Sequence, residues 1–465
     1  MAPALRILIV TFTGLITLIA TGCSHYRPSN SDRILSVDKS GRPENPLTGH
    51  QYAFGEYSSH IKNLCNGNGK TLLIYIHGGL NTESSANKRA DRITAAMYED
   101  GYQPVFINWK SGFITTYREH LFHDRQGEYW RFWGYPSSPF ILLEDLGRGI
   151  IKTPMVWWYQ SNDFLQSLFF GSFPSEERAK QINSNLLKDK QDPFGSVPKV
   201  VDEKGHLIDE RSGASKAFDG ILGVGRLALG LTTAPIFTSL GTGGWDTMKR
   251  RANIIIDKPQ PEQYVLDGRQ NQGGIDTTLG AAANFFDELQ RRQQADRSLK
   301  VVLVGHSMGT IIASKALRLW PDINYERIIY MAAACPIEDF RSSVAPHLKK
   351  TPPLGPKTAF YNYMLHPIAE NKEAHGFGIG GTGSLLNQID NMYENPVSES
   401  HRMLGKWVNA MNAIRFFDVP GVSKSQIHLV SMPLDGTKPD SHGSFDNVTF
   451  KKGYIWKFWS ADAVK

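Results

Sequence analysis

Cysteine is scarce in this chain, with three residues among 465, and that scarcity limits the protein classes that remain. A domain held together mainly by disulfide bonds needs several cysteine pairs, so that class is excluded. The excess of positive over negative charge is also small: the formal net charge is +6, and the longest basic run is Lys249 to Arg251. A run this short is typical of a solvated surface rather than of a nucleic-acid interface. The composition, 41% hydrophobic and 21% charged, indicates an ordinary globular protein.

The clearest uncharged hydrophobic run lies at the N-terminus, where residues 7–20 are apolar. A run of about 14 residues is short for a membrane-spanning helix, which needs about 20, so we predict a secretory signal peptide over 1–22. Small residues then precede Cys23, as in the lipobox of bacterial lipoproteins. This resemblance implies lipidation at Cys23 and a cell-envelope location, and Ser24 in place of Asp favours the outer membrane, facing the periplasm. An ordinary signal peptide or an uncleaved anchor is the alternative.

The rest of the chain alternates between strand-like and helix-like patterns, except in one long stretch. Residues 61–110 and 270–465 contain apolar runs separated by amphipathic segments, which predicts a mostly parallel α/β sheet with helices on both faces. Residues 111–269 break this alternation and are rich in aromatic residues, so we expect a large inserted cap there. Within it, the glycine-containing run 220–241 is predicted to be a cap helix rather than a membrane span. The polar residues 23–60 are predicted to be a lipid-anchored tether.

A Gly-x-Ser-x-Gly motif, Gly305 to Gly309, follows the apolar segment 301–304 directly and precedes a predicted helix. That strand–turn–helix context is the one in which the motif places a serine on a tight, strained turn. The flanking glycines let the strand and the helix approach each other without Cβ clashes. We therefore predict that Ser307 is a nucleophile, held at the positive end of the following helix.

A second motif, His77-Gly-Gly-Leu80, follows an early predicted strand. In hydrolases with a serine turn of this kind, such a loop supplies one backbone N–H of an oxyanion hole, and the residue after the nucleophile supplies the other. We expect the first donor to be Gly79 or Leu80 and the second to be Met308. His77 is expected to have a structural role.

These two motifs, in this order along the strands, resemble the α/β-hydrolase superfamily and, within it, the bacterial lipase- or esterase-like lipoproteins. The resemblance covers about 61–110 and 270–450. It implies an α/β-hydrolase sheet beneath the inserted aromatic-rich cap and a catalytic triad in the chain order Ser, acid, His.

The resemblance implies that the catalytic histidine lies in a loop after the last strand. His442 is in a Gly- and Ser-rich loop after the predicted strand 426–432, and we predict that it is the general base. His428 lies inside that strand, and His401 precedes it in a helix-like segment.

The acid is expected to follow the predicted strand 358–365. Glu370 is the first carboxylate after this strand, and we expect it to orient His442. Asp390, later in the same connection, and Asp339, after the predicted strand 327–332, are the alternatives.

Together these features predict a serine esterase or lipase that cleaves acyl esters, lipid-like ones in particular, through an acyl-enzyme. The aromatic residues of the cap favour apolar acyl groups. The expected partners are the ester substrate and, through the N-terminal lipid, a membrane, but no nucleic acid. This chemistry needs no metal or organic cofactor. The alternatives are an acyltransferase that uses the same triad and a non-catalytic envelope protein that uses the hydrolase fold for binding.

Overall fold

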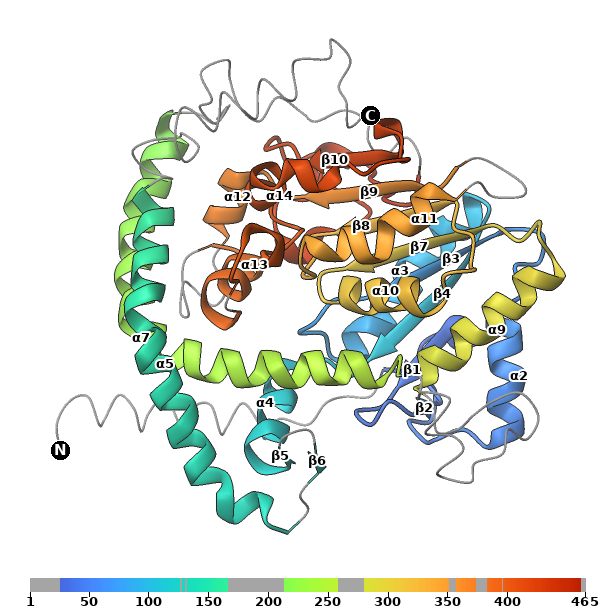
Figure 1. The fold of residues 1–465 in the computed structure, drawn as a ribbon, viewed down its shortest axis with the longest axis horizontal. Helices are drawn as coiled ribbons and strands as arrows, with labels where there is room; N and C mark the ends of the chain where they lie inside the picture. The colour runs from blue at the N-terminus through green and yellow to red at the C-terminus, as the bar shows by residue number, and fades with distance from the viewer. Residues whose placement is uncertain are drawn as a thin grey trace.

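One eight-stranded sheet forms the centre of the protein in the computed structural model (Figure 1). The strand order is β10-β9-β8-β7-β3-β4-β1-β2, and every neighbouring pair is parallel except the edge pair β1–β2. The predicted α/β class with a mostly parallel sheet is confirmed. The strands are β1 (Ile34–Val37), β2 (Pro43–Glu44), β3 (Thr71–Ile76), β4 (Tyr102–Trp109), β7 (Val301–His306), β8 (Arg327–Met331), β9 (Ala359–Met364) and β10 (Ile427–Ser431).

The structure describes most, but not all, of the chain. The predicted signal peptide 1–22 and the predicted lipidation site Cys23 lie outside the described residues, as do parts of the predicted cap. The described ranges are 26–125, 128–129, 132–165, 213–257, 280–350, 357–373, 383–394 and 396–460.

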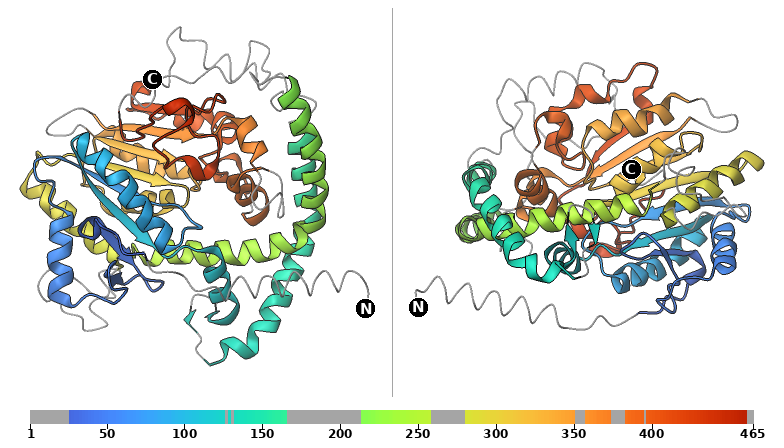
Figure 2. Two further views of the ribbon diagram at one scale, coloured as in Figure 1. Left: turned by 180° about the vertical axis from the view of Figure 1, so that it is seen from behind. Right: turned by 60° about the horizontal axis from the view of Figure 1, so that its bottom comes forward.

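Helices cover both faces of the sheet, so its central strands are almost entirely buried. All six residues of β7 are buried, as are five of the six in β3. Figures 1 and 2 show α10 on one face and α3 on the other. The helices are α2 (Phe54–Leu64), α3 (Glu83–Glu99), α4 (Phe113–Phe122), α5 (Gly134–Leu165), α7 (Gly213–Ile254), α9 (Ala281–Ala295), α10 (Gly309–Leu319), α11 (Ala345–Lys349), α12 (Pro367–Lys372), α13 (Leu385–Gln388) and α14 (Trp407–Asn412); a separate two-stranded ribbon joins β5 (Asp124–Arg125) and β6 (Glu128–Tyr129).

The N-terminal segment from residue 26 onward is part of the folded domain, so the prediction of a tether over 23–60 is wrong there. Strand β1 pairs with β4 in parallel, and all four of its residues are buried. Arg33 is buried beside it and donates to the carbonyls of Pro104, Asn63 and Leu64. The prediction failed because a four-residue strand between polar stretches gives almost no periodic signal.

Four helices in the described ranges lie between β4 and β7 in the chain: α4, α5, α7 and α9. Helices α5 and α7 pack side by side at one end of the sheet (Figures 1 and 2). Pro235 lies inside α7, which is bent in Figure 1; a proline removes a helical hydrogen bond and favours such a bend. Within the described ranges, no helix combines the length and the apolar character that crossing a membrane requires.

Candidate functional site

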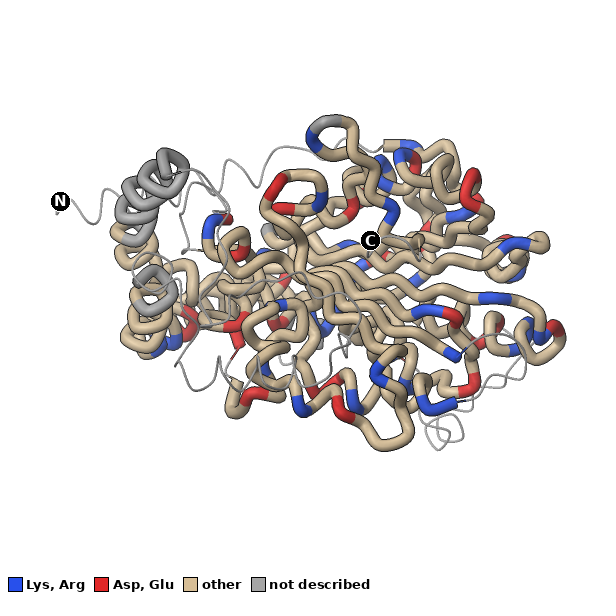
Figure 3. The backbone as a smooth tube through the Cα atoms, turned by 90° about the horizontal axis from the view of Figure 1, so that it is seen from above, with Lys and Arg blue, Asp and Glu red and all other residues tan. Residues whose placement is uncertain are grey.

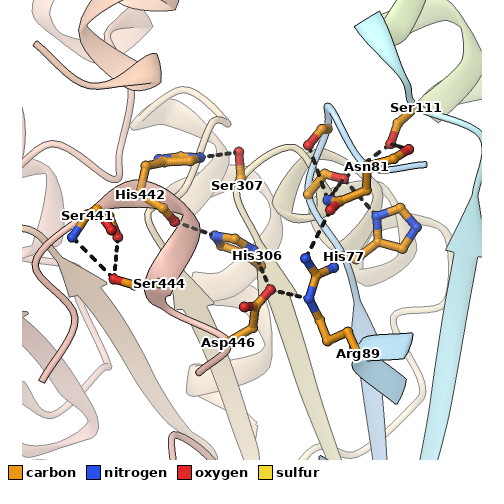
Figure 4. A network of polar contacts seen from close by, with 12 residues as sticks. His77, Asn81, Arg89, Ser111, His306, Ser307, Ser441, His442, Ser444 and Asp446 are labelled. Atoms are coloured by element: carbon orange, nitrogen blue, oxygen red, sulfur yellow. Dashed lines mark hydrogen bonds and ion pairs between the residues drawn. The ribbon is translucent and has the colours of Figure 1, made fainter. Parts of the chain in front are cut away.

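The carboxyl ends of β3 and β7 meet where the strand order changes direction. From β3 the chain continues to β4 on one side, whereas from β7 it continues through β8, β9 and β10 on the other. In open parallel sheets, ligands bind outside the carboxyl ends of the strands at such a switch point. Ser307 follows β7 and the loop 77–81 follows β3, so both predicted motifs lie at this point (Figure 4).

Ser307 occupies the tight turn that the sequence predicts. Its φ is 51°, in the left-handed region that non-glycine residues rarely adopt. A Cβ at Gly309 would clash with the carbonyl of Ile76, and a Cβ at Gly305 would lie 3.0 Å from the Cα of Thr310. The two glycines therefore allow β7, α10 and β3 to pack closely enough to hold the serine in this conformation.

His442 lies against Ser307, as predicted. Its Nε2 is 2.8 Å from Ser307 Oγ, and both residues are buried, with exposed fractions of 5% and 2%. His442 begins a short 3₁₀ turn after β10, in which the side chains and backbones of Ser441 and Ser444 form a capping box. That box fixes the backbone of the loop at the position from which the imidazole reaches the hydroxyl.

The loop after β3 approaches the serine at Gly78. A Cβ at this position would lie 2.8 Å from the Cβ of Ser307, so only glycine fits. His77 holds the loop: its Nδ1–H donates to the Gly78 carbonyl at 2.7 Å, and its Nε2 accepts the Trp109 N–H at 3.0 Å. Burial lowers the pKa of His77 to about 3, so the ring is neutral and can serve both bonds at once. The geometry agrees with the structural role expected for His77.

Three N–H groups are predicted as oxyanion donors: those of Gly79, Leu80 and Met308. The Leu80 N–H donates to the Ser111 carbonyl at 3.0 Å, so Leu80 is removed from the predicted oxyanion donors. Among the described residues, no acceptor is recorded for the N–H of Gly79 or of Met308. Gly79 lies in the loop after β3 and Met308 at the start of α10, so the two groups flank the serine turn, as the two donors of an oxyanion hole do.

The three predicted acids are bonded away from His442. Glu370 is buried on α12 against the Ser384 hydroxyl, and burial raises its pKa to about 8. Asp390 forms ion pairs with Arg402 at 2.9 Å and Lys406 at 3.2 Å, and Asp339 forms one with Arg318 at 2.8 Å. The prediction of Glu370, like both alternatives, is therefore wrong for this geometry, because the recorded side-chain partners of these carboxylates are not His442.

Glu373 is the carboxylate that contacts the predicted base, and sequence reasoning missed it. It follows the end of α12, and its Oε2 accepts the backbone N–H of His442 at 2.7 Å. Burial, partly opposed by this hydrogen bond, raises its pKa to about 7. One sequence feature could have identified Glu373: it lies in the connection after β9, where the acid is expected. The sequence could not show that Glu370 is buried on α12 whereas Glu373 lies just beyond the end of this helix.

A buried carboxylate, Asp446, links the two loops behind Ser307 (Figure 4). On one side it forms an ion pair with Arg89, whose guanidinium also donates to Asn81 Oδ1 at 2.9 Å. Asn81 in turn donates to the carbonyl of Gly78 at 2.9 Å. On the other side, Asp446 lies 3.9 Å from His306 Nδ1, and His306 Nε2 donates to the carbonyl of His442 at 3.1 Å. One carboxylate thus supports both the glycine loop and the His442 loop.

An apolar cavity of 360 Å³ opens onto Ser307. Helix α7 contributes Phe237, Trp245 and Met248 to its wall. The indole N–H of Trp245 donates to Glu394 at 2.6 Å, which fixes the ring in the wall. The lining comprises Gly79, Leu80, Phe113, Phe237, Trp245, Met248, Ser307, Met308, Leu385, Gln388, Ile389 and Tyr393.

The remaining histidines named from the sequence lie away from this cavity. His428 stacks on Tyr361 with ring centroids 4.3 Å apart, and His401 is 3.6 Å from Glu338. No group of three or more His, Cys, Asp or Glu side chains in the described ranges is arranged to hold a metal ion.

No protein-family model, no curated protein and no solved structure matches this chain. The arguments for function therefore come from the site itself.

Proposed function

We propose that the chain is a serine hydrolase of the α/β-hydrolase type that cleaves carboxylic esters. The single observation that carries the proposal is the 2.8 Å contact between Ser307 Oγ and His442 Nε2. A hydroxyl held within hydrogen-bond reach of a histidine is the arrangement of an activated nucleophile. The left-handed turn at Ser307 and the close approach of Gly78 support the same reading, because both orient the loops around one oxygen atom.

In the proposed reaction, Ser307 Oγ attacks the carbonyl carbon while its proton moves to His442 Nε2. The carbonyl oxygen becomes an oxyanion, which accepts hydrogen bonds from the N–H groups of Gly79 and Met308. The alcohol leaves with the proton from His442, and the acyl group remains on Ser307. A water molecule, deprotonated by His442, then releases the carboxylic acid and restores the hydroxyl.

Glu373 is the acid that we propose for the triad. An ionised carboxylate beside the base stabilises the imidazolium that forms during the attack. Glu373 already holds the backbone of His442, whereas Glu370, Asp390 and Asp339 are bonded elsewhere. Its raised pKa means that its charge depends on pH near neutrality.

The proposed substrates are esters with apolar acyl groups. The cavity beside Ser307 is lined mainly by aromatic and aliphatic side chains, which favour the burial of an apolar acyl chain over that of a polar acyl group. Helices α4 and α7 supply part of this lining, and this is the role proposed for the predicted cap. With lipidation at Cys23, the enzyme is proposed to act in the bacterial cell envelope, at the outer membrane.

A fluorophosphonate probe tests the proposal, because it reacts covalently only with activated serines. We expect labelling at Ser307, abolished by Ser307→Ala and strongly reduced by His442→Ala, together with hydrolysis of long-chain acyl esters. Absence of both labelling and ester hydrolysis in folded protein would refute the proposal and favour a binding protein. An acyltransferase would be labelled too, and it is distinguished by transfer of the acyl group to an added alcohol in preference to water.

A further inference from the structure

The outer face of α5 carries large apolar side chains that are exposed to solvent. Ile151 is 81% exposed, Phe140 is 74% exposed and Trp158 is 71% exposed. Separations of three, seven or eight residues place most of these side chains on one side of a helix. We call this surface the α5 apolar face; it comprises Phe140, Leu143, Ile150, Ile151 and Trp158 of α5, together with Trp133, which directly precedes the helix.

The opposite face of α5 is already used for packing, so the exposed face cannot turn inward. Val156 is fully buried against Ala234 of α7 and Met392. The indole N–H of Trp157 donates to the Leu231 carbonyl on α7 at 2.7 Å. The helix is therefore held in one orientation, with its second apolar surface directed away from the protein.

We propose that the α5 apolar face lies in the interfacial region of a phospholipid bilayer. Soluble monomers rarely expose so many large apolar side chains on one face of a helix. Trp and Phe combined with Leu and Ile on one helical face are the side chains that enter the boundary between headgroups and acyl chains. The exposed charged residues in the described side chains of α5 are Glu144 and Arg148, which pair with each other, so little charge would lose water on contact. Figure 3 shows few charged residues along the described parts of the helix pair at the left of the view.

The start of the folded domain favours lipid over a protein partner. Tyr26 Oη and the Ser29 N–H both donate to Asp91 at 2.9 Å, so the domain begins three residues after Cys23. Three extended residues span at most roughly 10 Å. A lipid on Cys23, as the sequence predicts, would then hold the surface of the domain against the bilayer without a long tether. A domain held that close to lipid requires a surface that lipid can cover.

The same face is structurally connected to the proposed active site. Helix α7 packs against α5, and further along its length it places Phe237 and Met248 in the cavity wall beside Ser307. The bilayer contact is thus one helix away from the acyl cavity. The inference does not depend on the proposed chemistry, although its choice of lipid as the occupant rests on the proposed lipidation of Cys23.

The test uses the full-length protein with Ser307→Ala, so that turnover has no influence on the result. A nitroxide is attached at Ile151→Cys, and a matched control label at Lys62→Cys, which is exposed on α2. The native Cys65 and Cys335 are buried. The protein is reconstituted in vesicles of phosphatidylethanolamine and phosphatidylglycerol, and relaxation of each label by oxygen and by a water-soluble nickel chelate is measured.

We expect the label at position 151 to lose relaxation by nickel and gain relaxation by oxygen on adding vesicles, while the label at position 62 stays accessible to nickel. Equal nickel accessibility at both positions would overturn the inference. So would dipolar broadening between labels at position 151 that disappears on dilution with unlabelled protein, because that identifies a second copy of the chain as the occupant. Failure of the proposed chemistry would appear separately, as absent fluorophosphonate labelling of protein that retains Ser307.

Discussion

At the scale of single residues, Asp446 has the most consequential position outside the reacting groups. It touches neither Ser307 nor His442 Nε2, yet it holds Arg89 on one side and approaches His306 on the other. We therefore regard Asp446 as a positioning residue. Replacing Asp446 with Asn removes the charge but keeps the size of the side chain, so an effect on catalysis can be distinguished from an effect on folding.

Asp446→Asn should lower kcat by about 10²-fold with little change in KM, because small displacements of the oxyanion loop and of the His442 loop misalign the attack. Steady-state ester hydrolysis measures the split between kcat and KM, and urea unfolding measures stability. Asp100→Asn is the matched control, since Asp100 pairs with Lys457 away from the site. A kcat equal to that of the unaltered protein would show that Asp446 is only a structural residue.

Glu373→Gln should lower kcat by about 10⁴-fold, as loss of a triad acid does. The pKa of Glu373 is raised to about 7, so the carboxylate that the mechanism requires is lost as pH falls below 7. We therefore expect kcat/KM of the unaltered protein to rise with pH through about 7, and this dependence to weaken in the variant.

Glu370→Gln is the matched control for Glu373→Gln and should leave kcat nearly unchanged. With a pKa raised to about 8, Glu370 is largely protonated at neutral pH, so glutamine mimics its neutral form. At pH values between the ordinary pKa of 4.5 and the raised pKa of about 8, the folded state binds more protons at Glu370 than the unfolded state does, so stability falls as pH rises. In urea unfolding, the free energy of unfolding of Glu370→Gln should therefore decrease less with rising pH than that of the unaltered protein. A collapse of kcat in Glu370→Gln would reinstate Glu370 as the acid.

At the scale of elements, the sequence predicts local features well and tertiary pairings poorly. The serine turn and the His442 loop could be predicted because a strand, a short motif and a turn are adjacent in the chain. The acid could not, because its role depends on where the residue after α12 lies relative to the His442 loop, which is distant in the sequence. Leu80 was named as a donor because nothing local shows that its N–H is bonded to Ser111.

The wall that α7 provides should decide which acyl chains are accepted. Met248→Trp places a larger side chain next to Gly79 and should reduce kcat/KM for long-chain esters by about 10-fold to 100-fold, with acetyl esters less affected. Met248→Ala should shift the preference toward longer chains. A chain-length series of esters measures both, and Asp246→Trp, on the exposed side of α7, is the control. Identical profiles in all variants would exclude this cavity as the acyl site.

At the scale of the whole molecule, the N-terminal segment belongs to the fold and supplies one edge of the sheet. Arg33→Met should lower the free energy of unfolding by about 3 kcal/mol, because two buried carbonyls and one partly buried carbonyl lose their donor. Urea unfolding measures this loss, and Arg27→Met, exposed in the same segment, should have little effect. Stability unchanged by Arg33→Met would mean that the segment is dispensable.

The glycines around Ser307 also set the limits of variation in this protein. A methyl group at position 78 would press on the nucleophile itself, and one at position 309 would press on the backbone of β3. Position 443, beside the catalytic histidine proposed here, has no atom within 4 Å of where a Cβ would stand. In a library selected for ester hydrolysis, positions 78 and 309 should return only glycine, whereas position 443 should drift freely. Closeness to the reacting atoms is therefore a poor guide to which residues selection can replace.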